Sequence, residues 1–103
     1  MNDCTENEET NVLMPCMYLQ HDLERYSAEI ELPGVRKEDI DIEVMENGMC
    51  ISGKRGETEL SGCWLLTHQI KVDEVKARYE EGILDIDLPL KNPLKRGRKV
   101  KVE

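Results

Sequence analysis

The chain has 103 residues, of which 39% are hydrophobic and 35% are charged, and its formal net charge is −8. This length suits one domain with one core, and no window holds the roughly eighteen consecutive apolar residues that a membrane span needs. The N-terminus lacks the basic region followed by an apolar run that marks a secretory signal. The sequence therefore predicts a cytoplasmic domain with no membrane partner.

Charge is divided unevenly between the body of the chain and its end. Residues 1–90 contain 8 Lys and Arg against 21 Asp and Glu, whereas residues 91–103 contain 6 against 1. An acidic body repels nucleic acid, and a short cationic tail without aromatic side chains is a weak basis for binding it. We therefore expect no nucleic-acid partner and interpret residues 91–103 as a charged tether.

The chain contains four cysteines, namely Cys4, Cys16, Cys50 and Cys63. They form no Cys-x-x-Cys pair, and without an export signal we interpret them as reduced thiols. Alternation places Cys50 and Cys63 on the face opposite their strongest apolar neighbours. His21 and His68 do not stand at a spacing typical of zinc sites, so we expect no metal site and no cofactor.

Residues 1–15 are mostly polar and acidic, which predicts a disordered N-terminal arm. From Cys16 the pattern changes to a period of two. In residues 26–32 the apolar positions are Tyr26, Ala28, Ile30 and Leu32. This alternation predicts a strand with one buried and one solvated face, and Pro33-Gly34 then predicts a type II turn.

Alternation resumes in residues 40–44, and Asn47-Gly48 predicts a hairpin with a type I′ turn. Residues 49–55 form the returning strand, with Met49 and Ile51 inward. The next strand is predicted at residues 63–72, where one face carries Trp64, Leu66, His68 and Ile70. We interpret Trp64 as a core residue, with a contact to a bound protein as the alternative.

Residues 77–89 (ARYEEGILDIDLP) give the clearest pattern in the chain. Two alternating strands flank Gly82, which is predicted to be the single left-handed residue of a bulged turn, and Pro89 ends the second strand. The inward positions are Val75, Ala77, Tyr79, Leu84, Ile86 and Leu88. No stretch keeps a 3.6-residue apolar period, so the chain is predicted to be an all-β antiparallel sandwich with little helix.

The order of these segments resembles the small heat-shock protein (α-crystallin domain) family. The motifs are residues 28–35 (AEIELPGV) with 37–40 (KEDI), residues 47–48 (NG) with 51–55 (ISGKR), and residues 77–84 (ARYEEGIL) with 88–89 (LP). The resemblance spans most of residues 17–90 and implies an immunoglobulin-like β-sandwich. It divides the chain into the arm at 1–15, an α-crystallin-type domain at 16–90 and a basic tail at 91–103.

What the resemblance implies is an ATP-independent holdase chaperone of the stress response, which binds partly unfolded client proteins through exposed apolar surface and self-associates. A Val-x-Val motif, Val100 and Val102, would dock in a groove of a neighbouring domain. The groove maps to Ile40, Ile42, Val44, Val75, Ala77 and Tyr79. The arm offers Leu13, Met14, Met17 and Tyr18 as client contacts.

Two questions stay open from the sequence. Only six residues (GETELS) lie between Arg55 and Gly62, so a strand-swapped dimer, a dimer through another edge and a monomer are all considered. The alternative function is a specific protein-interaction or co-chaperone module of the CS-domain type, with little general holdase activity.

Catalysis has little support. Cys63 and His68 would lie on opposite faces of one predicted strand, about 16 Å apart at about 3.3 Å per residue. Asp85 and Asp87 share a face, but alternating acids on an exposed strand are ordinary solvated side chains. We therefore expect no catalytic residue and no enzyme activity.

Overall fold

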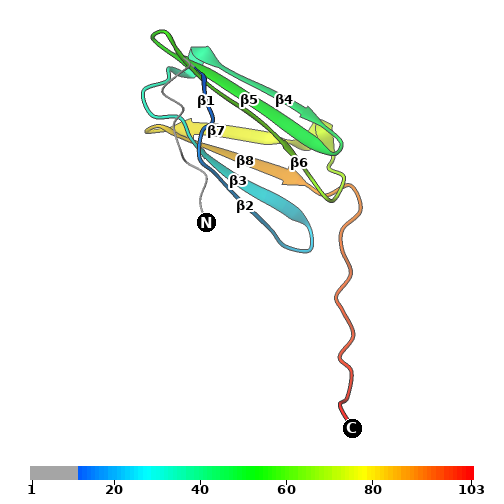
Figure 1. The fold of residues 1–103 in the computed structure, drawn as a ribbon. Helices are drawn as coiled ribbons and strands as arrows, with labels where there is room; N and C mark the ends of the chain where they lie inside the picture. Colours follow the sequence, from blue (N-terminus) through cyan, green and yellow to red (C-terminus); the bar gives the residue numbers. More distant parts are fainter. Residues whose placement is uncertain (1–11) are drawn as a thin grey trace.

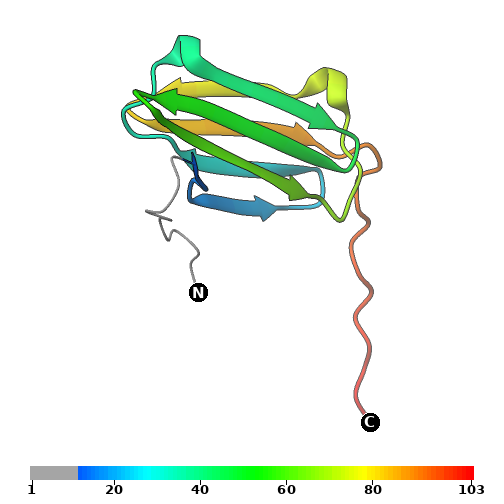
Figure 2. The ribbon, with the colours of Figure 1, turned by 45° about the horizontal axis from the view of Figure 1, so that its top comes forward.

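The computed structural model describes residues 12–103, which fold into two stacked sheets (Figures 1 and 2). The strands are β1 Val12–Leu13, β2 Met17–His21, β3 Arg25–Glu31, β4 Ile40–Met45, β5 Gly48–Arg55, β6 Thr58–Leu65, β7 Lys76–Glu80 and β8 Ile83–Pro89. Two short 3-10 helices are η1 Lys37–Asp39 and η2 Val72–Glu74. One sheet has the order β1-β6-β5-β4 and the other β2-β3-β8-β7, which confirms the β-sandwich. No helix within residues 12–103 is long and apolar enough to cross a membrane.

The core lies between the sheets and is built from alternate strand positions. Central strands β3 and β8 pair antiparallel, so that Ala28 stands opposite Ile86 and Ile30 opposite Leu84. The buried apolar residues are Tyr26, Ala28, Ile30, Leu32, Val35, Met49, Ile51, Leu60, Leu66, Ile70, Leu84, Ile86, Leu88 and Leu90. Apolar burial on this scale is the main favourable term in folding, and the inward positions expected on β3, β5 and β8 are confirmed.

Two turns lie together at one end of the sandwich. At Pro33-Gly34 the Val35 N–H donates to the Leu32 carbonyl at 3.2 Å and Gly34 has φ +83°, which confirms the type II turn. The β7–β8 turn differs from the expectation, because both Glu81 (φ 51°) and Gly82 (φ 81°) are left-handed. It is a tight two-residue turn and not a bulge with a single left-handed residue.

The β4–β5 hairpin is present, but its turn lies one residue earlier than expected. Met45 pairs with Gly48, so Glu46 and Asn47 form the turn, and neither has a positive φ. The type I′ turn predicted at Asn47-Gly48 is therefore wrong. Gly48 is required for another reason, since a Cβ there would stand 2.9 Å from the Trp64 carbonyl oxygen.

Strand β6 begins and ends earlier than the strand predicted at residues 63–72. The chain turns at Gly56-Glu57, where Gly56 has φ +64°, and Thr58 then pairs with Arg55. Residues 58–61 are thus part of a long β5–β6 hairpin and not a loop. After Leu65 the chain leaves this sheet and crosses to the other one.

The N-terminal arm and the cysteines also depart from expectation. Val12–Leu13 pairs parallel with β6, so the end of the arm predicted as disordered is a strand, whereas Cys4 and the rest of residues 1–11 lie outside the described residues. Cys50 and Cys63 form a disulfide, with Cα atoms 4.1 Å apart, because the register of β5 and β6 places them directly opposite. Cys16 is disulfide-bonded as well, so reduced thiols were the wrong interpretation.

Candidate binding borders of the sandwich

The first candidate site, the β4–β7 border, lies where the edge strands of the two sheets run along the same side of the sandwich (Figure 2). Its inward-facing residues are Ile40, Ile42, Val44, Val75, Ala77 and Tyr79. Five are half-buried and pack against the core. Ala77 is exposed, although its cross-strand partner Ile86 is buried, since β7 has no strand on its outer side. The border therefore leaves apolar side chains partly open to solvent.

Tyr79 has a second role that its spacing did not reveal. Its hydroxyl lies 2.7 Å from the Leu32 carbonyl and 2.6 Å from the Val35 carbonyl, and it donates a hydrogen bond that the two oxygens share. This contact holds β7 against the turn that carries Gly34. Tyr79 thus shapes one end of the β4–β7 border and does not only line it.

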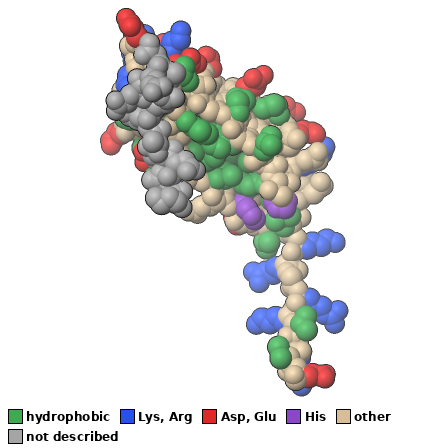
Figure 3. All heavy atoms as spheres, viewed as in Figure 1, with side chains coloured by type: hydrophobic (Ala, Val, Ile, Leu, Met, Phe, Trp, Pro, Cys, Tyr) green, Lys and Arg blue, Asp and Glu red, His purple; other side chains and the backbone are tan. Residues whose placement is uncertain are grey.

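The second candidate site, the β2–β6 border, lies on the opposite side of the sandwich. Its apolar residues are Leu13, Met14, Met17, Leu19 and Trp64. Leu13, Met17 and Trp64 are half-buried against the core, whereas Met14 and Leu19 are 47% and 37% exposed. Hydrophobic side chains gather on this side in Figure 3. The structure therefore brings three of the four predicted client contacts together.

Tyr18 is the predicted client contact that stands apart from the other three. It pairs with Glu29, whereas Met17 and Leu19 pair with the buried Ile30 and Ala28. Alternation along β2 therefore turns Tyr18 to the outer face of its sheet, where it is 48% exposed.

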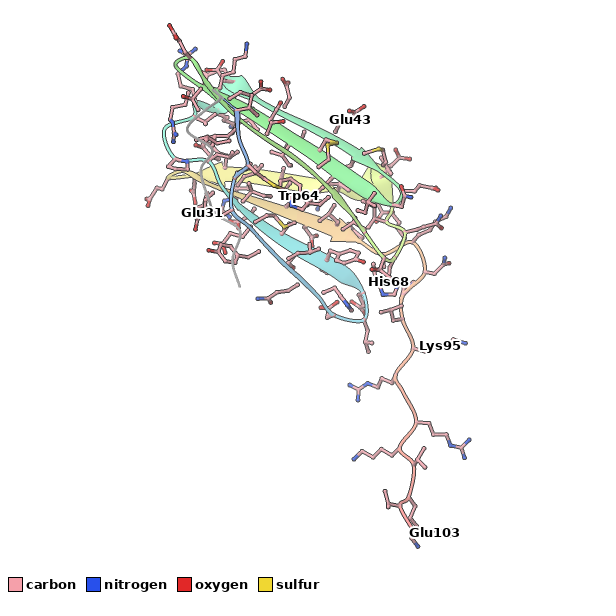
Figure 4. All side chains as sticks on the ribbon, viewed as in Figure 1. Glu31, Glu43, Trp64, His68, Lys95 and Glu103 are labelled. Atoms are coloured by element: carbon pink, nitrogen blue, oxygen red, sulfur yellow. A yellow bond between two sulfur atoms is a disulfide. The ribbon has the colours of Figure 1, made fainter. Side chains whose placement is uncertain are left out.

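Trp64 and Leu65 are neighbours at the end of β6, but Trp64 faces the core and Leu65 faces solvent. Trp64 is half-buried and packs against the core, in agreement with its interpretation as a core residue (Figure 4). Leu65 is 88% exposed and was not among the predicted contact residues. Its outward position in the alternation of β6 was the signal that predicts this exposure.

The C-terminal tail leaves the sandwich after Leu94 and extends away from both sheets (Figure 1). The Leu94 N–H donates to the Leu23 carbonyl at 2.7 Å, and this contact anchors the base of the tail. Val100 and Val102 are 84% and 91% exposed, so the Val-x-Val motif does not lie on its own domain. The basic side chains follow the tail on both sides of it (Figure 3).

The β2–β3 turn is fixed by a carboxylate next to His21. The backbone N–H groups of Glu24 and Arg25 donate to Asp22 Oδ1 at 2.7 and 2.9 Å. These hydrogen bonds, the one from Glu24 foremost, stabilise the charged form and lower the pKa of Asp22. The turn holds the end of β2 in place.

The polar candidates of the sequence analysis separate into three cases. Cys63 is held in its disulfide and is not available as a nucleophile. Asp85 is exposed, and Asp87 accepts from Arg25 at 2.9 Å in a surface ion pair. His21 and His68, by contrast, are brought together, with ring centroids 5.4 Å apart. Sequence spacing could not show this proximity, because the two residues belong to different parts of the sandwich.

The fold and its borders define a class of protein: a small β-sandwich with partly open apolar edges and an extended tail. Residues 18–103 match the family described as the Hsp20/alpha crystallin family. The chain therefore belongs to the small heat-shock proteins, a family of chaperones.

Curated relatives and solved structures agree with this membership. The chain is 26% identical to a "Probable 15 kDa heat shock protein" of Leptospira interrogans, over 96% of this chain and 87% of the relative. It is 35% identical to "Heat shock protein HSP.16.4" of Streptococcus thermophilus, over 62% of this chain and 57% of the relative. The fold is similar to that of heat shock protein 16.0 from Schizosaccharomyces pombe, with a TM-score of 0.72, 21% identity, and coverage of 88% of this chain and 99% of that one.

Proposed function

We propose that this protein is an ATP-independent holdase that binds partly unfolded clients through its apolar borders and keeps them from aggregating. The observation that carries the proposal is the exposed apolar surface of the β2–β6 border. There Met14 and Leu19 are open to solvent, and Trp64 is half-buried against the hydrophobic core. Exposed apolar side chains gathered in this way are typical of surfaces that bind other polypeptides.

Self-association through the tail is the second part of the proposal. Val100 and Val102 would dock at the β4–β7 border of a neighbouring copy, with Lys101 facing away. Burying both valines gives roughly 3–4 kcal/mol before ordering costs, which corresponds to about millimolar affinity. One tail alone is too weak to hold a complex, so several tails must act together. Weak and exchangeable contacts suit a chaperone whose binding surface must open.

The central experiment follows light scattering of a thermolabile enzyme during heating, with and without the protein and without nucleotide. We expect aggregation to be delayed in proportion to the amount of protein added. The double variant Met14→Ser, Leu19→Ser should reduce protection, because it removes the two most open apolar side chains of the β2–β6 border. Val72→Ser is the matched control and should protect as wild type does, since Val72 is exposed to the same 37% as Leu19 but lies in η2.

Absence of protection at several-fold excess would favour the alternative, a specific interaction or co-chaperone module of the CS-domain type. The tight β5–β6 hairpin supports that alternative, since residues 58–61 pair within their own sheet and are not free to reach a partner. For either function we propose a cytoplasmic location and no catalytic activity. In a reducing cytoplasm we expect the Cys50–Cys63 disulfide to be open for part of the time.

A further inference from the structure

The two histidines of this chain meet at the end of the β2–β6 border, close to the base of the tail (Figure 3). His21 is the last residue of β2 and pairs with the buried Tyr26 of β3, so both side chains lie on the same side of their sheet. His68 comes from the segment between β6 and η2 (Figure 4). Their ring centroids are 5.4 Å apart and the ring planes make an angle of 76°. We propose that His21 and His68 form a binding site for a late first-row divalent cation such as Zn²⁺, Ni²⁺ or Cu²⁺.

Both rings are held in position by Tyr26. The Tyr26 hydroxyl accepts a hydrogen bond from the His68 backbone N–H at 2.9 Å, which fixes the chain that carries the second ring. The tyrosine ring packs edge-on against His21, with centroids 5.4 Å apart, and lies 6.2 Å from His68. The contacts of Tyr26 thus keep the two imidazoles near each other.

The hydrogen bond of His21 leaves its Nε2 atom available to bind a metal. His21 Nδ1 lies 3.1 Å from the Asp22 carbonyl oxygen. A carbonyl oxygen only accepts, so Nδ1 carries the hydrogen and Nε2 keeps its lone pair. A histidine that binds a metal through one nitrogen commonly donates its other N–H to a backbone carbonyl. Asp22 in turn is held by the hydrogen bonds from Glu24 and Arg25.

The spacing of the rings also fits one shared ion. A metal bound at about 2.0–2.1 Å from a ring nitrogen lies about 3.2 Å from the ring centroid, and a tetrahedral angle then separates two centroids by about 5.2 Å. The observed separation is 5.4 Å. Within residues 12–103 no cluster of three or more His, Cys, Asp or Glu side chains is close enough to hold an ion, so water completes the coordination. Imidazole ligands favour zinc, copper and nickel over magnesium or calcium.

A cation bound here would connect the edge strand of one sheet to the segment that leaves the other. Because the unfolded chain does not hold the two rings together, binding stabilises the folded state. The site is independent of the proposed chaperone function and would exist in a protein with any role. The ion would link the two sheets at the end of the β2–β6 border that lies away from Met14 and Met17.

The test uses the full chain, oxidised so that its cysteines do not bind metal, stripped with EDTA and then titrated with ZnCl₂ by calorimetry. We expect one Zn²⁺ per chain, and a rise of about 10 °C or more in the unfolding midpoint at about 100 times the dissociation constant. His21→Gln and His68→Gln should each weaken binding about ten-fold or more, because the ion needs both rings. Gln20→Ala, at an exposed neighbour on β2, is the matched control and should bind as wild type does.

A second readout does not depend on the variants folding well. Long-range ¹H–¹⁵N spectra of the wild-type imidazoles should show Nε2 of His21 and one nitrogen of His68 shifting together as Zn²⁺ is added. The proposal is overturned if wild type binds no more tightly than the variant that carries both substitutions. It is equally overturned if each single variant keeps half of the bound Zn²⁺ at unchanged affinity, since this result would mean two separate sites.

Discussion

The hydroxyl of Tyr79 holds the edge strand β7 against the end of the sandwich. It donates to the carbonyls of Leu32 and Val35 at the end of the sandwich. Both acceptors belong to the chain around the type II turn between β3 and η1. Without the hydroxyl the Leu32 carbonyl keeps the Val35 N–H as its donor, whereas the Val35 carbonyl would have to find another donor in a partly buried position. An unpaired buried acceptor is costly.

Tyr79→Phe should therefore lower the free energy of unfolding by about 1–2 kcal/mol, because the ring is kept and only the hydroxyl is lost. Urea denaturation followed by circular dichroism measures this difference. Tyr18→Phe is the matched control, since Tyr18 is 48% exposed on β2, and its urea midpoint should equal that of wild type. Equal midpoints for all three proteins would contradict a structural role for the Tyr79 hydroxyl.

Single residues also mark the limit of what the sequence could predict. Alternation correctly placed Tyr79 inward and Cys50 outward, because a strand has a period of two. It could not give the carbonyl partners of the hydroxyl or the residue opposite Cys50, since both depend on which strands pair and in which register. The proximity of His21 and His68 could not be predicted for the same reason.

At the scale of elements, the hairpins were predicted well and their turns poorly. The apolar pattern alone located the strands of β3, β4, β5, β7 and β8. At Asn47-Gly48 the preferred turn sequence was overridden, since Gly48 is needed where β5 passes close to the Trp64 carbonyl. The left-handed pair occurs instead at Glu81-Gly82, in the two-residue connection between β7 and β8, whose two positive φ values are those of a type I′ turn.

The β5–β6 hairpin is the element that the Cys50–Cys63 disulfide constrains. The two cysteines are 13 positions apart, and a bridge that closes a loop of this size stabilises the folded state by about 2–3 kcal/mol, mainly by restricting the unfolded chain. The double variant Cys50→Ser, Cys63→Ser should lose this amount in oxidising buffer, as measured by urea denaturation. Both positions lie on the outward face, so little packing is lost with the sulfur atoms.

Reducing conditions give the control for this prediction. With dithiothreitol present the bridge is absent from both proteins, and the difference between wild type and the double variant should disappear. Identical urea midpoints in oxidising buffer would mean that the bridge does not form in solution. A difference that persists after reduction would mean that the side chains matter through packing and not through the bond.

The whole molecule combines an acidic body with a basic tail, and the order of charges along the sequence is enough to predict this division. The family and the sandwich followed from the order of the strand motifs. The surface that the tail would bind could not be predicted from the sequence. Alternation indicates that Val100 and Val102 face the same way, but it does not indicate which surface they contact. The β4–β7 border is the receiving surface we propose, since its inward-facing side chains are incompletely covered in the isolated chain.

If tails cross-link copies, then replacing both valines by alanine should shrink the assembly. Val100→Ala with Val102→Ala removes about 3 kcal/mol of apolar burial per tail, nearly all of the expected docking energy. Sedimentation velocity across a concentration series should show a lower mass than wild type, and deletion of residues 100–103 should have the same effect. Lys101→Arg is the control, because this side chain alternates away from the valines and keeps its charge. If the double alanine variant and the deletion variant both keep the wild-type mass, the tail does not hold the assembly together. Only the strand edges would then be left to join the copies.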